Sequence, residues 1–172
     1  VELCVVQSSG DKDQKSDLWV VAVDGKTPPH KLTSTSGGES GVAWSPDGKR
    51  LAFSAKREGD SDEQIYVLEL YAAGEAQRVT NAPLGARTPK FSPDGTKILY
   101  VADAWPGAKD DADNRRLEKE RKDRKYDVRV YETFPIRNWD KWLDERQARL
   151  YVQSLEPGSE AKDLFADSTL LR

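Results

Sequence analysis

The chain has 172 residues, of which 37% are hydrophobic and 33% are charged, and its formal net charge is −3. This length fits one domain, and the negative charge argues against the basic surface that general nucleic-acid binding needs. No apolar run approaches the roughly 20 residues that cross a bilayer. The single cysteine, Cys4, excludes an internal disulfide framework and fits a small buried residue of a strand. We therefore expect neither nucleic acid nor membrane as a partner.

Three short apolar runs stand near the start of the chain. Residues 3–7, 17–23 and 30–33 each fit a β-strand. The unit that follows has an additional first strand. Residues 1–35 are therefore predicted to form an incomplete copy of that unit.

Residues 42–80 form the first complete unit. Its strands are predicted at residues 42–44, 50–55, 64–70 and 77–80. Ser-Pro-Asp-Gly joins the first two strands: the proline fixes φ, the aspartate bonds nearby backbone and the glycine takes positive φ. The third strand is apolar at nearly every position, as a strand covered on both faces requires. The fourth strand is short and polar, which fits an outer edge.

The same unit recurs 47 residues later. Ser45 to Gly48 returns as Ser92 to Gly95, and Leu18 precedes Ile65 by the same interval. A period in the forties built from short strands is typical of β-propeller blades. We therefore predict an all-β fold, a partial β-propeller of four-stranded antiparallel blades. The predicted divisions are an incomplete blade at 1–35, a blade at 42–80 and a blade at 89–165.

A long insertion at 103–148 interrupts the last blade. Stretches of that length inside a domain are usually functional or flexible. Residues 103–114 are rich in proline, glycine and aspartate and indicate a loop, whereas 115–125 is a charge run in which Glu118 and Lys122 can pair across a helical turn. The charge run favours a solvent-exposed arm over a specific anion site. The insertion is thus predicted to be partly helical.

The second half of the insertion carries the candidate site. Residues 126–131 alternate like a strand, and Asn138 can cap a short helix that reaches Arg149. The two tryptophans of this helix are expected to pack the insertion onto the propeller rim. Its arginine and aspartate fit either a structural ion pair or a site for a peptide terminus. The candidate substrate-binding residues are Arg137, Trp139, Asp140 and Trp142.

Catalytic and metal-binding patterns are weak in this sequence. The segment from Gly38 to Val42 approaches the Gly-x-Ser-x-Gly elbow of serine hydrolases, but it lacks the last glycine and precedes a strand. The one histidine, His30, opens an edge strand, and no Ser-His-acid set is evident around it. There is no Cys/His zinc spacing and no phosphate loop, and the loop aspartates complete no calcium motif; these are Asp11, Asp13, Asp17, Asp60 and Asp62. We predict no catalytic residue, metal or cofactor in this chain.

The repeat resembles the TolB-like branch of WD-type β-propellers. Units of that branch run in the order Trp/Phe-Ser-Pro-Asp-Gly, an apolar strand, an Ile-Tyr-Val strand and Leu-Thr. The corresponding segments here are Trp44–Gly48, Leu51–Phe53, Ile65–Val67 and Val79–Thr80. The stretch Pro135–Trp142, followed by Arg149–Val152, is similar to a segment of the dipeptidyl-peptidase V and acylaminoacyl-peptidase-like members of the prolyl oligopeptidase family.

The peptidase resemblance implies a non-catalytic propeller that caps a C-terminal α/β-hydrolase domain of the parent chain and filters its peptide substrates. The serine nucleophile, its acid and its histidine would then lie beyond Arg172. The implied location is periplasmic or secreted, with cytoplasmic as the alternative. The alternative function is a TolB-like scaffold for protein–protein interaction, which predicts further blades and no hydrolase domain in the parent.

The number of blades bears on assembly. Two complete blades and one incomplete blade are fewer than the roughly four to eight of a closed propeller, so we expect a piece of a longer protein. Broad uncovered blade faces favour association. The isolated piece is expected to be a dimer or a marginally stable monomer.

Overall fold

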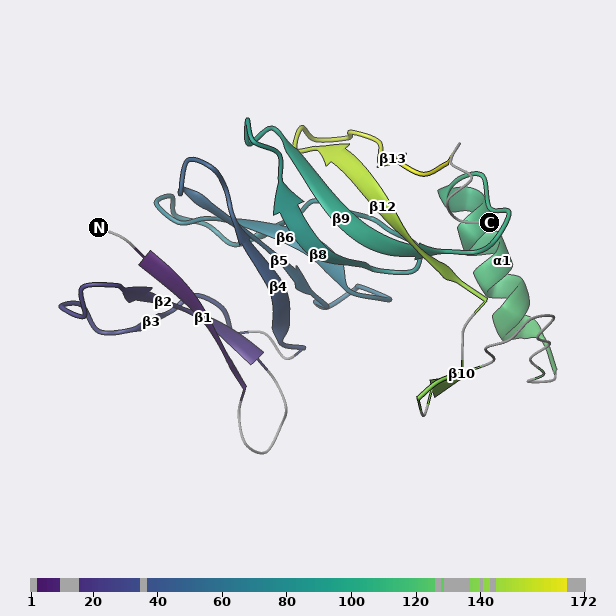
Figure 1. The fold of residues 1–172 in the computed structure, drawn as a ribbon, viewed down its shortest axis with the longest axis horizontal. Coiled ribbons are helices and arrows are strands. Elements are labelled where there is room, and N and C mark those ends of the chain that lie inside the picture. Colours follow the sequence, from purple (N-terminus) through teal and green to yellow (C-terminus); the bar gives the residue numbers. More distant parts are fainter. Residues whose placement is uncertain are drawn as a thin grey trace.

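Figure 1 shows three of the antiparallel sheets standing side by side, with one helix beside the third of them, and a fourth, two-stranded sheet lies in the insertion. The computed structural model describes residues 3–9, 16–34, 37–125, 128, 137–139, 141–142 and 145–166. Within these ranges the fold is the predicted one, an all-β set of propeller blades with a partly helical insertion.

The three sheets are the blades. Blade 1 has the order β1 (Leu3–Ser9), β2 (Ser16–Ala22), β3 (His30–Lys31). Blade 2 has the order β4 (Glu39–Trp44), β5 (Arg50–Ala55), β6 (Gln64–Glu69), β7 (Gln77–Arg78). Blade 3 consists of β8 (Ala86–Phe91), β9 (Lys97–Ala104), β12 (Gln147–Ser154) and β13 (Lys162–Asp163).

The sequence period reappears in the packing between blades. Blade 1 meets blade 2 in a buried cluster that contains Leu18, Phe53, Ala55 and Tyr66. Blade 2 meets blade 3 in a second cluster made of Ala52, Ile65, Ala86, Ile98, Tyr100 and Ala102. Three positions of the first cluster return 47 residues later in the second, namely Leu18/Ile65, Phe53/Tyr100 and Ala55/Ala102. Each blade is therefore held to the preceding one by the same apolar contact.

In blades 1 and 2, a threonine after the outer strand supports that contact. The Leu18 backbone N–H donates to Thr33 Oγ1 over 3.0 Å, and the Ile65 N–H donates to Thr80 Oγ1 over 2.9 Å. Both hydroxyls then donate onward, but to different acceptors. Thr33 donates to the buried carboxylate of Glu39 at 2.8 Å, which belongs to the next blade. Thr80 donates to the side-chain oxygen of Gln64 at 2.8 Å, which belongs to the same blade.

The Ser-Pro-Asp-Gly turns form as predicted, one in blade 2 and one in blade 3, and a hydrogen bond joins them. In the first turn the Arg50 N–H donates to Ser45 Oγ over 2.9 Å, and Gly48 has φ of 68°. In the second turn the hydroxyl of Ser92 donates to Asp94, and this bond lowers the pKa of Asp94 to about 2. The Arg50 guanidinium reaches across to the carbonyl of Gly95 in the second turn, at 2.8 Å.

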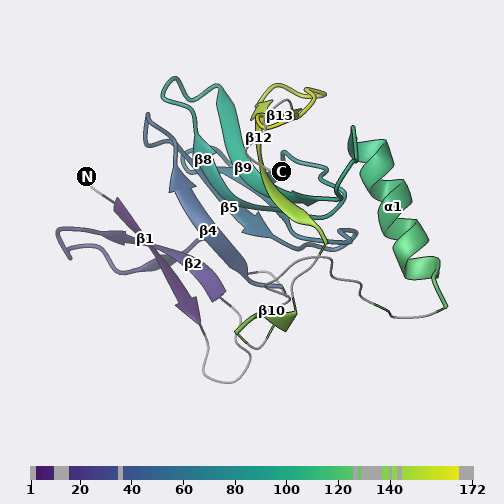
Figure 2. The ribbon, with the colours of Figure 1, turned by 45° about the vertical axis from the view of Figure 1, so that its right-hand side comes forward.

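The helix of the insertion is α1 (Asp111–Asp123). Asp110 is its N-cap residue, and the Asp110 side chain accepts a hydrogen bond from the Asp113 N–H. The predicted Glu118–Lys122 pair is present at 3.2 Å. Buried Asn114 ties the first turns of α1 to blade 3 by accepting from the Trp105 backbone N–H at 2.8 Å. Figure 2 shows α1 at the side of the molecule farthest from blade 1. In the described part of the chain, no helix has the length and apolar character that spanning a bilayer requires.

The predicted helix from Asn138 to Arg149 is wrong. Strands β10 (Arg137–Asn138) and β11 (Lys141–Trp142) pair as a short antiparallel hairpin. Strand β12 begins at Gln147, inside the range predicted as helix. Trp139 has φ of 57°, which no α-helix contains, and by starting at Gln147 instead of the predicted Leu150, β12 gains three more pairs along β9. The strand predicted at 126–131 lies, apart from Val128, outside the described residues.

Candidate functional site

The four candidate residues from the sequence belong to the β10–β11 hairpin. Arg137 and Trp142 are opposite each other in the hairpin register. The side chains of these two residues, and all of Asp140, lie outside the described part of the chain. The side chain of Trp139 is 90% exposed, so it does not pack onto the blades as the tryptophans were expected to. A role for this hairpin in substrate binding stays a prediction.

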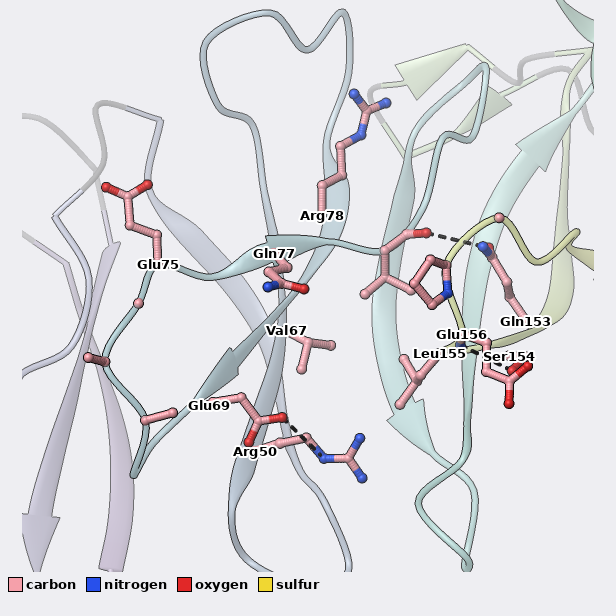
Figure 3. A pocket seen from close by; sticks show the side chains of 16 residues that line it. Arg50, Val67, Glu69, Glu75, Gln77, Arg78, Gln153, Ser154, Leu155 and Glu156 are labelled. Atoms are coloured by element: carbon pink, nitrogen blue, oxygen red, sulfur yellow. Dashed lines mark hydrogen bonds and ion pairs between the residues drawn. The ribbon is translucent and has the colours of Figure 1, made fainter.

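A groove lies between blades 2 and 3 (Figure 3). Its cavity has a volume of about 450 Å³. One wall comes from β5, β6 and the connection into β7, and the other comes from the end of β12 and the residues that follow it. The sequence did not indicate this groove because its walls are separated by about half of the chain. Only the packing of one blade on the next brings them together.

The groove combines an apolar floor with charged rims. Val67 and Leu155 face each other in Figure 3, and Arg50 lies at one end, 4.0 Å from a carboxylate oxygen of Glu69. The amide of Gln153 closes the other end by donating to the Val79 carbonyl across the blade boundary, at 3.1 Å. A polypeptide in extended form has the alternating apolar and polar groups that such a lining can accept.

Beyond Gln153 the same blade boundary opens into a second cavity of about 790 Å³, which we call the α1 cavity. The first turn of α1 forms one wall, and β12, β13 and the residues between them form the other. Tyr100 and Tyr151 stack in its lining, with ring centroids 5.7 Å apart. Burial raises the pKa of both phenols, that of Tyr151 to about 12.

Blade 2 contains a buried ion cluster in the corresponding place. The hydroxyl of Tyr66 donates to Asp60 at 2.7 Å, and the Arg78 guanidinium lies 3.0 Å from the other oxygen of that carboxylate. Burial alone would raise the pKa of Asp60. The bonds from Tyr66 and the Arg57 N–H, together with the neighbouring guanidinium charges, nevertheless hold it below its usual value. Burial and the bond to Asp60 raise the pKa of Tyr66 to about 12.

The residues that approached a catalytic motif lie in ordinary blade strands. Ser40 and Gly41 are inside β4, at a bulge where Gly41 has φ of 61°, whereas a nucleophile elbow joins a strand to a helix. His30 is in β3 of blade 1, paired with Val20. Among the described residues, no group of three or more His, Cys, Asp or Glu side chains is arranged to hold a metal ion.

These blades, their repeated Ser-Pro-Asp-Gly turns and their inter-blade contacts define a β-propeller protein. The family model of the TolB beta propeller domain matches residues 4–115, which is more than half of the chain. The chain therefore belongs to the TolB beta propeller domain family. The matched region ends inside the insertion, shortly after α1 begins.

Individual proteins extend this comparison. Dipeptidyl-peptidase 5 of Porphyromonas endodontalis is 30% identical over 165 residues, covering 90% of this chain but only 21% of the relative. An acylaminoacyl peptidase structure from Pyrococcus horikoshii matches 95% of the chain with a TM-score of 0.59 and 16% identity, over 24% of its own length. A putative TolB structure from Agrobacterium tumefaciens matches 95% with a TM-score of 0.58 and 21% identity, over 45% of its own length. At these identities the structures establish the fold alone.

Proposed function

We propose that this chain is the non-catalytic propeller of a serine peptidase of the dipeptidyl-peptidase and acylaminoacyl-peptidase type. In that protein it caps an α/β-hydrolase domain and limits which peptides reach the nucleophile. The grooves between its blades and the inserted hairpin are the surfaces that an approaching peptide would contact. This chain supplies surfaces for binding and exclusion, and the hydrolase domain supplies the reaction.

The observation that carries the proposal is the extent of the match to dipeptidyl-peptidase 5. Residues 103–148 make up more than a quarter of the chain, so a match that covers 90% of it must extend into this insertion. The propeller family model, in contrast, stops at residue 115. In sequence, the match to a peptidase thus continues into the insertion, where the match to the propeller family model has ended, and this supports the peptidase proposal.

The TolB-like scaffold is the second candidate. The putative TolB structure matches the fold as well as the acylaminoacyl peptidase does, with TM-scores of 0.58 and 0.59. Fold alone does not separate the two candidates. They differ in what the parent protein contains besides its blades.

The test is to express the whole open reading frame that encodes this chain and to treat the product with a fluorophosphonate, which labels activated serines. We expect a labelled site outside residues 1–172 and hydrolysis of dipeptidyl or acylaminoacyl p-nitroanilides. The 172-residue chain alone should show neither. A parent that contains only further blades and is not labelled would contradict the peptidase proposal and favour the scaffold.

The filtering role has its own test in the full-length peptidase. Replacing the exposed Trp139 by alanine should raise KM for peptide substrates and leave kcat unchanged, if this side chain contacts the substrate before the reaction. Tyr71→Ala is the matched control, because Tyr71 is another aromatic side chain that is largely exposed. Equal kinetics in both variants would remove Trp139 from the substrate path.

A further inference from the structure

The boundary between blades 2 and 3 shows which surface of a blade receives the next one. On blade 2 this surface contains two cross-strand pairs of β5 and β6, Ala52 with Val67 and Ser54 with Ile65. Ala52, Ser54 and Ile65 are 0% exposed. Val67 packs against the buried cluster that includes residues of blade 3, and so does Val79, which follows β7. We call the surface of a blade that the next blade covers its far face.

Blade 3 has a far face with the same register, but this one is only half-buried. Its cross-strand pairs are Leu99 with Val152 and Val101 with Leu150, and both members from β9 follow their blade 2 counterparts by 47 residues. The Leu164 N–H donates to the Leu150 carbonyl, which repeats a hydrogen bond of blade 2. Leu164 is 44% exposed and extends the face. Blade 3 therefore presents an apolar surface of the kind that blade 2 buries.

Blade 1 presents the opposite kind of surface, which we call the near face because it lies toward the preceding blade. In blade 2 this face includes Tyr66, which is 5% exposed and belongs to the cluster with blade 1, and Leu68, which packs against that cluster. Trp19 and Val21 precede these two residues by 47 positions. In blade 1 both side chains are half-exposed. Trp19 pairs with Val6 of β1.

The two uncovered faces lie at opposite ends of the molecule. Figure 1 shows blade 1 and blade 3 at the two ends of the row of blades, with blade 2 between them. The buried Leu18 and Ala22 of β2 alternate with the half-exposed residues of the near face. A second molecule can therefore contact either end without disturbing the contacts that already join the blades.

The sizes of the side chains favour contact between these two faces. In the boundary between blades 2 and 3, the small Ala52 and the large Tyr100 belong to one cluster. On the far face of blade 3 the position of Ala52 is taken by Leu99, which is larger. In β1 the register position of Tyr100 is taken by Val6, which is smaller. The total size of the pair is thus nearly conserved, as a close-packed contact between sheets requires.

The number of blades determines how many copies can close a ring. Each chain provides three blades, and closed propellers have about four to eight. One copy is below this range, two copies provide six blades, and three copies provide nine. A contact between unlike faces forms a ring when the rotation closes. Because each blade follows the preceding one through the same contact, two copies fit this condition.

We propose that two copies of this chain associate head to tail and close a ring of six blades. The far face of blade 3 in each copy covers the near face of blade 1 in the other. The contacts are apolar and run from sheet to sheet, like those between the blades of one copy. This inference goes beyond the proposed function, because it requires no hydrolase domain. In a longer parent protein, further blades would take the place of the second copy.

The first experiment is analytical ultracentrifugation of the 172-residue chain over a range of concentrations. We expect a species with the mass of two chains, each of 19.3 kDa. No larger species should form as the concentration rises, because a closed ring has no uncovered face left. A chain that stays monomeric at every concentration would contradict the proposal, and so would an open-ended series of larger species.

Two variants test the two faces separately. Val101→Glu places a charge on the far face of blade 3, and Val21→Glu places one on the near face of blade 1. Each should raise the Kd of the dimer at least about 100-fold, because the charge would be buried without a partner. Val128→Glu is the matched control, since this valine is 53% exposed and belongs to the insertion. It should leave the Kd unchanged, and circular dichroism establishes that all three variants are folded.

The variants also distinguish a head-to-tail ring from other dimers. In the ring each seam needs one far face and one near face, so a mixture of the Val101→Glu and Val21→Glu chains should recover a heterodimer with one native seam. A Val21→Glu chain that remains as dimeric as the wild type would mean that two far faces meet, which would overturn the proposal. Equal weakening by Val128→Glu would do the same. None of these outcomes bears on whether the parent protein has a hydrolase domain.

Discussion

Blades 2 and 3 differ mainly at one end. At the turn end they are close copies, with Ser45-Pro-Asp-Gly and Ser92-Pro-Asp-Gly making the same hydrogen bonds. At the other end the link from β5 to β6 is a short loop, whereas the link from β9 to β12 contains α1 and the β10–β11 hairpin. The repeated end maintains the contact between blades. The variable end is where a new cavity has been added without altering that contact.

The largest expected effect concerns the repeated contact. Phe53 is fully buried between blades 1 and 2, so Phe53→Ala should lower the free energy of unfolding by about 3–5 kcal/mol. Urea denaturation followed by circular dichroism measures this change. Tyr71→Ala, at a side chain that is 74% exposed, should change stability by less than about 0.5 kcal/mol. Similar losses in the two variants would mean that the inter-blade cluster does not hold the blades together.

The next effect separates the two third-strand tyrosines. Tyr66→Phe removes a hydrogen bond to the buried Asp60 carboxylate and should cost about 1.5–3 kcal/mol of unfolding free energy. Tyr151→Phe should cost less than about 0.5 kcal/mol, because its hydroxyl has no partner within the described residues. Equal losses would show that the Tyr151 hydroxyl has a partner inside the chain.

A smaller effect of opposite sign is expected at the β-bulges. Gly41 and Thr88 are 47 residues apart and have φ of 61° and 55°. A Cβ at Gly41 would lie 3.3 Å from the Thr88 backbone, so Gly41→Ala should destabilise the chain by about 1 kcal/mol or more. Thr88→Gly should stabilise it by up to about 1 kcal/mol, since glycine adopts positive φ without strain. Thermal unfolding of both variants tests this, and destabilisation by Thr88→Gly would be the contrary result.

The sequence predicted the blades well because their constraints are local and repeated. Ser-Pro-Asp-Gly determines each turn by its own chemistry, and Leu18 and Ile65 are recognised by their position in the period. The hairpin at Arg137 to Trp142 was predicted incorrectly as a helix, because its spacing of aromatic residues also fits a helical face. At the other end of the predicted helix, residues 147–149 pair with β9 instead, and this long-range pairing has no local signal in the sequence.

The cavities were not predictable from the sequence for a different reason. Tyr100, Asp111 and Tyr151 come from β9, α1 and β12, and no local pattern connects them. Their proximity depends on how the insertion folds back on the blade.

The smallest expected effect is a loss of stability at alkaline pH, and it involves the same two tyrosines, Tyr66 and Tyr151. The pKa of Tyr66 and that of Tyr151 are each raised to about 12, from 10.0. A raised pKa in the folded state gives stability that is complete below pH 10 and is lost as pH rises toward 12. The free energy of unfolding should therefore decline between these values. In the double variant Tyr66→Phe/Tyr151→Phe the decline should be shallower, although the variant is less stable at pH 7. An unchanged slope in urea titrations across this range would mean that other groups cause the alkaline loss, and that neither phenol is as buried in solution as its blade implies.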